Sequence, residues 1–236
     1  MSTCVITGIG SGIGRSVAVE LSKRNQYDNY SLLGRNIESI KDTIQIMKQY
    51  GTRCIDYYEI DLADIYKIPD IINSIAEKYG SIDALYNIAG YTDPQPLLGT
   101  SIESFELTYR VNVFAPFVLM KEVAKNMKTN GGKILNVAST AGMTPRPGWL
   151  SYASSKASVI AMSETLTAEL AEYGIKVYCV SPGRCATKLR TRLAPDEDQT
   201  TIMQPEEVAE VVCNLMSINE SCLDGQNIII RKQMNK

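Results

Sequence analysis

"TGIGSGIG", residues 7–14, holds four glycines in eight positions, between a β-like run (residues 3–7) and a helix-like stretch (residues 14–24). Glycines this dense destabilise an ordinary helix or strand, so the segment indicates a tight turn with bare backbone. A glycine turn that follows a strand and opens a helix is typical of dinucleotide binding, because free N–H groups and the helix dipole favour a pyrophosphate. A plain strand–helix joint is the alternative reading of this segment alone.

Three glycines of this turn have separate expected tasks. Gly8 permits the sharp turn out of the strand, Gly12 lets the backbone approach a pyrophosphate, and Gly14 lets the helix sit close to the sheet. Ser11 and Ile13 lie between them and belong to the same expected cofactor contact.

Short β-like runs alternate with amphipathic stretches along the chain. The predicted strands are residues 3–7, 30–34, 53–59, 84–88, 133–138, 176–181 and 227–231. The longest predicted helices are residues 14–24, 37–49, 102–128 and 152–173. Most strands are apolar without alternation, as in strands that are buried on both faces. The expected fold class is therefore α/β, a Rossmann-type doubly wound sheet of about seven parallel strands with helices on both faces, in one domain over residues 1–236.

The composition is ordinary for a globular protein. The 236 residues are 44% apolar and 21% charged, enough for one substantial core. The net charge of −2 implies no general attraction to nucleic acid or to an anionic membrane. Since no apolar run approaches the roughly 20 residues of a spanning helix and no secretion signal is visible, a cytoplasmic protein is expected. Its six cysteines are expected to be buried free thiols in a reducing compartment.

The chain contains no histidine. Ser-His-Asp and Cys-His catalysis are therefore excluded within one chain, as are His-ligated zinc sites, and no metal site is predicted. Acid–base chemistry has to use Tyr, Lys, Asp, Glu, Cys or Ser side chains.

Six further motifs follow the glycine turn in chain order. They are Asp61-Leu62, Asn87-Ile88-Ala89-Gly90, Asn112, Ser139, Tyr152 with Lys156, and Ser181-Pro182-Gly183 with Thr187. Together with the Gly8-x3-Gly12-x-Gly14 spacing, the series resembles the short-chain dehydrogenase/reductase family, classical single-domain type, over nearly the whole chain. The resemblance implies an oxidoreductase that moves a hydride between a nicotinamide cofactor and a carbonyl or secondary alcohol group.

Tyr152 and Lys156 lie four residues apart, on one face of a predicted helix. A free phenol titrates at about 10. A neighbouring ammonium, together with the positive charge of an oxidised nicotinamide, is expected to lower that pKa so that Tyr152 exchanges protons at neutral pH. The resemblance implies Tyr152 as acid/base and Lys156 as a ligand of the cofactor ribose. It implies Ser139 as a hydrogen-bond donor to the substrate and Asn112 as the residue that positions a proton-relay water. An ordinary surface pair is the alternative for Tyr152 and Lys156.

The resemblance also implies the residues that hold the cofactor, with Asp61 beside the adenine. The expected contacts are Gly8, Ser11, Gly12, Ile13, Gly14, Arg35, Asn36, Asp61, Leu62, Asn87, Ala89, Gly90, Tyr152, Lys156, Pro182, Gly183 and Thr187.

The choice between NADP and NAD depends on the carboxyl end of the second predicted strand. An acidic residue there binds the ribose 2′-hydroxyl, whereas an arginine accommodates a 2′-phosphate. That end reads Gly34-Arg35-Asn36, and Asp28 precedes the strand, at the wrong end of the sheet. NADP(H) is therefore predicted, with NAD(H) as the alternative in which Arg35 stacks on adenine. Ser11, where many NADP-preferring relatives carry a basic residue, argues for the alternative.

The substrate side is weakly specified. Residues 183–204 are expected to form a mobile lid or an exposed surface loop. The resemblance puts Met143, Trp149, Gly183, Arg184 and the loop to Gln204 around the substrate pocket. Trp149 either forms a wall of the pocket or packs the loop. Arg184 receives an anionic group or faces solvent. Nothing here separates acyl chains, sugars, steroids and small ketones.

Two other functions fit parts of the sequence. A catalytically idle dinucleotide-binding regulator would keep the fold but lose Tyr152, Lys156 or Ser139, and all three are present. A sugar-nucleotide epimerase or dehydratase usually has a longer chain. Surplus apolar positions on residues 102–128 and 152–173, together with the resemblance, predict a homotetramer, with a homodimer as the alternative.

Overall fold

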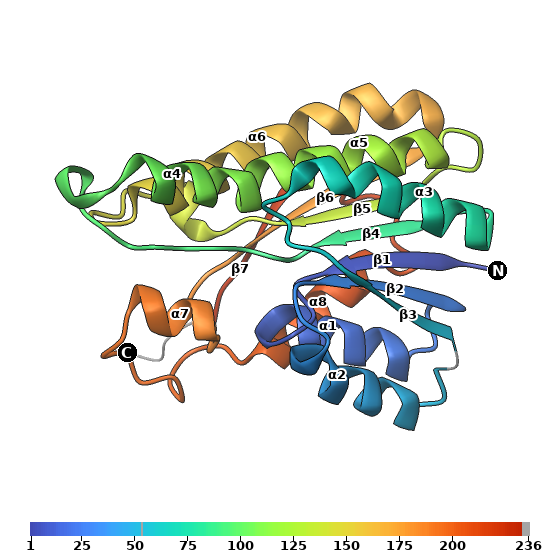
Figure 1. The fold of residues 1–236 in the computed structure, drawn as a ribbon, viewed down its shortest axis with the longest axis horizontal. Coiled ribbons are helices and arrows are strands. Elements are labelled where there is room, and N and C mark those ends of the chain that lie inside the picture. Colours follow the sequence, from blue (N-terminus) through green and yellow to red (C-terminus); the bar gives the residue numbers. More distant parts are fainter. Residues whose placement is uncertain (53, 233–236) are drawn as a thin grey trace.

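The computed structural model describes residues 1–52 and 54–232, which contain one parallel sheet (Figure 1). Its strands are β1 (Thr3–Thr7), β2 (Asn29–Gly34), β3 (Cys54–Glu59), β4 (Ala84–Asn87), β5 (Gly132–Val137), β6 (Ile175–Pro182) and β7 (Asn227–Ile230). They lie in the order β3-β2-β1-β4-β5-β6-β7, and every neighbouring pair is parallel. The predicted fold class is confirmed, while the predicted strand start at residue 53 lies outside the described residues.

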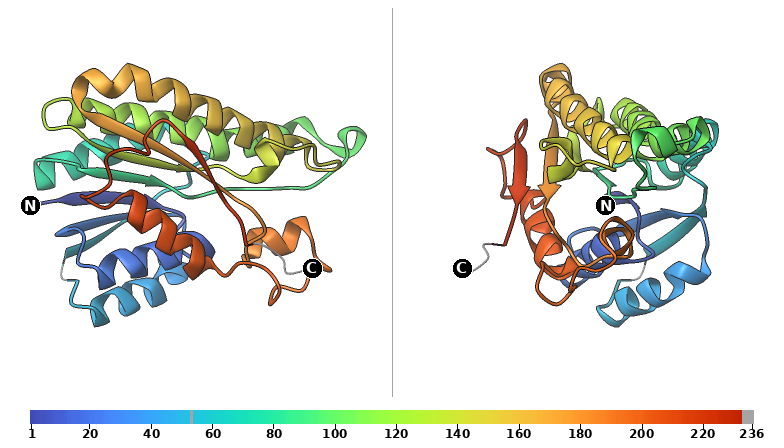
Figure 2. Two further views of the ribbon diagram at one scale, coloured as in Figure 1. Left: turned by 180° about the vertical axis from the view of Figure 1, so that it is seen from behind. Right: turned by 90° about the vertical axis from the view of Figure 1, so that its left-hand side faces the viewer.

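Helices cover both faces of the sheet (Figure 1 and Figure 2). On one face lie α3 (Ile68–Tyr79), α4 (Ile102–Tyr109), α5 (Ala115–Met127) and α6 (Leu150–Leu170). On the other face lie α1 (Gly12–Lys23), α2 (Glu38–Gln49) and α8 (Pro205–Leu215). The short helix α7 (Lys188–Leu193) stands beyond the carboxyl ends of the strands, where it borders the functional site.

The central strands are apolar along their whole length because both of their faces are buried. All five residues of β1 are buried. Ile6 belongs to the hydrophobic cluster that contains Val17 and Leu21 of α1, whereas Val5 belongs to the opposite cluster with Ile72 of α3. A strand between two helical layers has no solvent-facing side, so the polar alternation of a half-exposed strand is missing.

The predicted helix over residues 102–128 is confirmed as one helical segment over residues 102–127, with a change of helix type inside it. The structure divides it into α4 and α5, joined by the π-helical turn Arg110–Phe114. A π turn inserts one extra residue into the helical ladder and is frequent at functional sites. Asn112 is buried in this turn, and Pro116, at the start of α5, lacks the N–H of an unbroken helix. A periodic apolar pattern does not reveal one inserted residue, so the sequence predicts the helix but not its π turn.

The sequence pattern missed α3, α7 and α8. The start of α8 carries a recognisable signal, a capping box in which the Glu207 carboxylate accepts a hydrogen bond from the Gln204 backbone N–H at 2.7 Å, followed by Pro205. α7 has only six residues, too few for a periodic pattern. The predicted helix 152–173 consists of α6 and a closing 3₁₀ turn, Ala171–Tyr173.

The described helices include none with the length and apolar character needed to cross a membrane. The six cysteines are free thiols, and four of them are buried. Within residues 1–52 and 54–232, no three His, Cys, Asp or Glu side chains are arranged to hold a metal ion.

Candidate active site

A cavity of about 700 Å³ opens where the strands from β1 to β6 end. The strand order reverses between β1 and β4, and doubly wound sheets bind ligands at such a switch point. The predicted site residues that line the cavity are Gly8, Ser11, Gly12, Ile13, Gly14, Arg35, Asp61, Leu62, Ala89, Gly90, Ser139, Tyr152, Lys156, Pro182, Gly183 and Thr187. Asn36, Asn87 and Asn112 are not among its lining residues.

The glycine turn approaches its neighbours so closely that side chains would clash. Gly8 and Gly12 have φ angles of +77° and +56°, in the left-handed region that favours glycine. A Cβ on Gly8 would lie 2.7 Å from the Ala89 nitrogen, and one on Gly12 would lie 2.9 Å from Thr187 Cγ2. The turn, the segment after β4 and the start of α7 therefore meet at one end of the cavity.

The backbone N–H groups in the first turn of α1 are not capped by the side chain of the N-cap residue, so they are available as hydrogen-bond donors. Ser11 is its N-cap residue, with extended backbone, but its side chain accepts no hydrogen bond from the first turn. The first turn also lacks an acidic residue. The first N–H groups of a helix need acceptors, and the positive end of the helix dipole favours an anion. The turn therefore fits the pyrophosphate of a dinucleotide cofactor.

Gly14→Ala is expected to lower the free energy of unfolding by about 3 kcal/mol, at the upper end of the range for overpacked sites. A Cβ at Gly14 would lie 2.3 Å from the carbonyl oxygen of Gly8, and backbone cannot move aside as a flexible side chain can. Urea unfolding measures the change. Gly99→Ala is the control, because its Cβ would lie 3.6 Å from the nearest atom. Equal midpoints for both variants would contradict the close approach.

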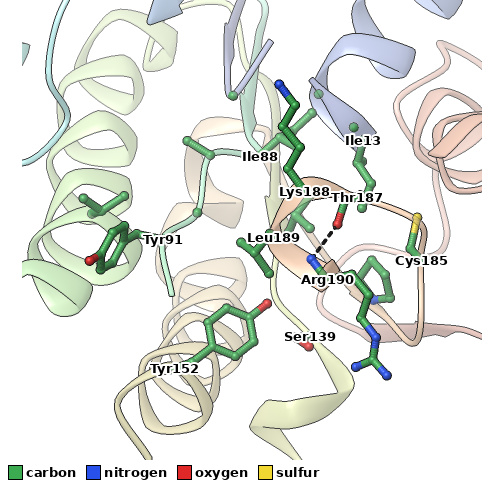
Figure 3. A pocket seen from close by; sticks show the side chains of 18 of the residues that line it. Ile13, Ile88, Tyr91, Ser139, Tyr152, Cys185, Thr187, Lys188, Leu189 and Arg190 are labelled. Atoms are coloured by element: carbon green, nitrogen blue, oxygen red, sulfur yellow. Dashed lines mark hydrogen bonds between the residues drawn. The ribbon is translucent and has the colours of Figure 1, made fainter. Parts of the chain in front are cut away.

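Ser139, Tyr152 and Lys156 converge on this cavity from two elements. Ser139 follows β5, and Tyr152 and Lys156 occupy successive turns of α6. Tyr152 is only 6% exposed and Lys156 only 4%. The Lys156 ammonium donates to the Val137 carbonyl at 2.8 Å and lies 5.9 Å from the centre of the Tyr152 ring. Figure 3 shows the Tyr152 hydroxyl directed into the cavity, with the Ser139 hydroxyl on the neighbouring wall.

Burial controls the acid–base properties of this pair. It raises the pKa of Tyr152, opposed by a hydrogen bond with Ser139 and by the positive charge of Arg190. Burial also lowers the pKa of Lys156 to about 8. In the protein alone, loss of hydration outweighs the effects of Ser139 and Arg190 on the pKa of Tyr152. The expected lowering, which also depends on the charge of an oxidised nicotinamide, stays a prediction.

Asn112 acts as a tether between elements. Its side-chain oxygen accepts from the Tyr91 N–H at 2.8 Å, and its amide donates to the Tyr91 carbonyl at 2.9 Å and to the Ser155 hydroxyl at 3.0 Å. The segment after β4 is thereby fixed against α6. A Cβ on Gly90 would lie 3.7 Å from both Asn112 Oδ1 and Lys156 Nζ, so Asn112 stands directly behind the cavity wall.

The other two asparagines have local partners. Asn87 is buried within the sheet and donates to the side-chain oxygen of Asn136 at 2.9 Å, which links β4 to β5. Asn36 is exposed and accepts from the Glu38 N–H at 2.7 Å, at the start of α2. Both stabilise the elements that frame the cavity.

Arg35 is exposed at the carboxyl end of β2 and lines the cavity beside Ser39. Within the described part of the chain it forms no ion pair. Asp28 lies at the opposite end of that strand, where its carboxylate accepts from the Ser2 N–H at 2.7 Å. The charged side chain that follows the carboxyl end of β2 and lines the cavity is therefore cationic.

The segment 183–204 is organised around Glu197. Its carboxylate binds Arg190 of α7 through two contacts, at 2.5 and 2.7 Å, and Arg184 at 3.2 Å. The Arg190 guanidinium also lies 5.6 Å from the Trp149 ring centre. Trp149 thus both lines the cavity and packs against this segment, whereas Met143 is not a lining residue.

Three basic lining residues were not singled out by the sequence: Arg146, and Lys188 and Arg190 within the predicted substrate loop 183–204. The side chains of Lys188 and Arg190 are visible in Figure 3, close to Thr187. Thr187 caps α7 by accepting from the Arg190 N–H at 3.1 Å. A threonine followed by a basic run was the one signal that could have revealed them.

Comparison with known proteins agrees with this architecture. A family profile described as short chain dehydrogenase matches residues 2–198. The 3-oxoacyl-[acyl-carrier-protein] reductase FabG of Thermotoga maritima is 30% identical over 236 residues, covering 95% of this chain and 94% of that protein. The 2,3-dihydro-2,3-dihydroxybenzoate dehydrogenase of Bacillus subtilis is also 30% identical, covering 93% of each.

Solved structures show the same fold. NAD⁺-bound xylitol dehydrogenase superposes with a TM-score of 0.86 at 26% identity, covering 98% of this chain and 97% of that one. ElxO with NADP bound superposes with a TM-score of 0.85 at 26% identity, covering 97% and 96%. The motif series, the fold and the relatives lead to one conclusion: the chain belongs to the short-chain dehydrogenase/reductase family of oxidoreductases.

Proposed function

We propose that this chain, as one domain over residues 1–236, is an NADPH-preferring oxidoreductase that interconverts a carbonyl group and a secondary alcohol. The observation that carries the proposal is the convergence of Ser139, Tyr152 and Lys156 on the cavity that also contains the glycine turn. A site that holds a nicotinamide cofactor and an acid/base group together has what hydride transfer to a carbonyl requires.

Each side chain has a distinct task. A bound nicotinamide cofactor supplies or accepts the hydride. The Tyr152 hydroxyl gives a proton to the substrate oxygen during reduction and removes it during oxidation. Ser139 donates a hydrogen bond to the same oxygen and stabilises its developing charge. Lys156 binds the cofactor ribose and stabilises the phenolate form of Tyr152. Asn112 positions the proton-relay water and, through its hydrogen bonds to the Tyr91 backbone, the cavity wall at Gly90.

The cofactor contacts follow the shape of the cavity. The glycine turn would hold the pyrophosphate, Asp61 and Leu62 would flank the adenine, and Thr187 would close over the turn from α7. The cationic end of β2 supports NADP(H) over NAD(H), since an arginine there neutralises a 2′-phosphate.

Arg35→Ala is expected to weaken NADPH binding by about tenfold or more and to leave NADH binding nearly unchanged, because the lost charge faces only the 2′-phosphate. Titrations followed by nicotinamide fluorescence give both affinities. Lys48→Ala, an exposed cation on α2, is the control. NADH preference in the wild type would overturn the role of Arg35 but not that of Tyr152. Failure of the folded protein to bind either nucleotide would overturn the proposed function.

A homotetramer is part of the same proposal. Phe114 and Phe117 are 46% and 50% exposed next to and on α5, and such an apolar surface supports a subunit contact. Light scattering of the purified protein decides between tetramer and dimer. The cytoplasmic location stays a prediction.

A further inference from the structure

A second cavity, of about 730 Å³, adjoins the active-site cavity. The two share Thr140, Arg146, Gly183 and Arg184 as lining residues. Thr140 follows the proposed substrate ligand Ser139, so the second cavity extends from the substrate end of the site. Among the predicted cofactor residues, it includes only Gly183.

The second cavity is strongly basic. It is lined by Arg146, Arg184, Arg231 and Lys232, and no described carboxylate lines it. The whole chain has a net charge of −2, so this positive charge is local and does not follow from composition. Cations around a concave site with low-dielectric walls focus their field on a ligand.

The fold brings these cations together from distant segments. The Gly183 N–H donates to the Ile230 carbonyl at 2.9 Å, and a Cβ on Gly183 would lie 3.7 Å from Arg231 Cγ. The end of β7 thereby places Arg231 beside the segment that follows β6. Met203 accepts from the Ala186 N–H at 2.8 Å and donates to the Arg184 carbonyl at 3.2 Å, which fixes the same segment from the other side.

The charges of this cavity are only partly neutralised within the protein. Arg184 pairs with Glu197 at 3.2 Å and Lys232 pairs with Glu207 at 3.1 Å. Arg146 lies 5.9 Å from the Trp149 ring centre, and neither it nor Arg231 pairs with a carboxylate in the described residues. Two guanidinium groups are therefore available for a ligand.

We infer that the second cavity is the anion subsite of the substrate, so that the enzyme acts on carbonyl compounds or alcohols that carry a carboxylate or phosphate group. The inference rests on the proposed function for the reacting end of the molecule. Guanidinium groups bind carboxylate and phosphate oxygens in bidentate geometry, and Arg146 and Arg231 provide two of them from separate segments that line the cavity. The reacting carbonyl would lie at Ser139 and Tyr152, with the anionic group toward Arg231.

The binding test uses inorganic pyrophosphate as the probe and protein saturated with NADP⁺, so that the glycine turn is filled. Calorimetry is expected to show one submillimolar site in the wild type and affinity lowered by about tenfold or more in the double variant Arg146→Gln/Arg231→Gln. The control Lys48→Gln/Lys121→Gln removes the same charge from exposed positions elsewhere. Absence of wild-type binding, or equal weakening in the control, would overturn the subsite.

The catalytic test compares each anion with its neutral ester: acetoacetate with methyl acetoacetate, and levulinate with methyl levulinate. We expect kcat/KM to favour the anion by about tenfold in the wild type and in the control, and the preference to vanish in Arg146→Gln/Arg231→Gln. Equal kcat/KM values for acid and ester would overturn the proposal that the substrate carries an anionic group. The cavity would then be a site for free phosphate. Cofactor binding without any hydride transfer would instead count against the proposed function, and the pyrophosphate result would stand separately.

Discussion

Tyr152→Phe is expected to lower kcat/KM for carbonyl reduction by about 10³-fold or more while NADPH binding stays within about twofold of the wild type. The substitution removes the Tyr152 hydroxyl, which faces the cavity that Ser139 also lines, and keeps the buried ring. Without it, the developing alkoxide has no acid to protonate it. Stopped-flow absorbance of the cofactor measures the hydride-transfer step, and fluorescence titration measures cofactor binding.

Tyr66→Phe is the matched control for this prediction. It removes the same hydroxyl from a side chain that is 80% exposed and does not line the cavity, so both measurements should equal those of the wild type. Retention of more than about a tenth of the activity by Tyr152→Phe would show that another group transfers the proton. Parallel loss of cofactor binding and activity would show that Tyr152 only shapes the site.

Lys156→Met is expected to lower kcat/KM by about 10²-fold or more and at the same time to stabilise the fold at pH 7 by about 2 kcal/mol. Burial lowers the pKa of Lys156 from its ordinary value to about 8, so the folded protein disfavours the ammonium form. At pH 7 folding has to desolvate that charge, and methionine removes the cost. The lost hydrogen bond to the Val137 carbonyl offsets part of the gain.

The destabilising effect of the buried Lys156 ammonium depends on pH in a predictable direction. Between about pH 8 and 10.5 the unfolded chain binds more protons at Lys156 than the folded chain, so this residue makes wild-type stability rise with pH across that window. The advantage of Lys156→Met is therefore largest below pH 8 and is lost as the pH approaches 10.5. Urea unfolding of both proteins at several pH values measures the difference, in which the contributions of other groups cancel.

Lys48→Met is the control, since Lys48 is exposed on α2 and away from the cavity. It should change neither activity nor the slope of stability against pH. A Lys156→Met variant less stable than the wild type at pH 7, or a difference that does not vary with pH, would contradict a desolvated ammonium at this position.

Much of the architecture could be predicted because its determinants are local. The glycine turn at residues 7–14 requires backbone conformations and approaches that other residues do not allow, and it marks the joint between β1 and α1. The continuous apolar runs predict strands buried on both faces, as β1 is. The order of the motifs also predicts which side chains meet, because the carboxyl ends of parallel strands lie along one edge of the sheet.

Other features depend on contacts between distant segments and could not be predicted. Asn112 in the π turn forms side-chain hydrogen bonds with Tyr91 and Ser155, which lie 21 and 43 residues away in the sequence. The raised pKa of Tyr152 comes from burial, a property of the surrounding elements rather than of the neighbouring residue types.

The sequence by itself thus determined the sheet and the glycine turn, since both rest on local backbone geometry and apolar patterning. It also placed Tyr152 and Lys156 on one helix face through their spacing. Only the tertiary structure decided the charge around the substrate end of the site. Arg146, Arg184 and Arg231 come from three separate segments of a chain with a net charge of −2. They line one cavity because they follow β5, β6 and β7, which pair side by side. Electrostatic potential depends on distances in space, which composition and local patterns do not contain.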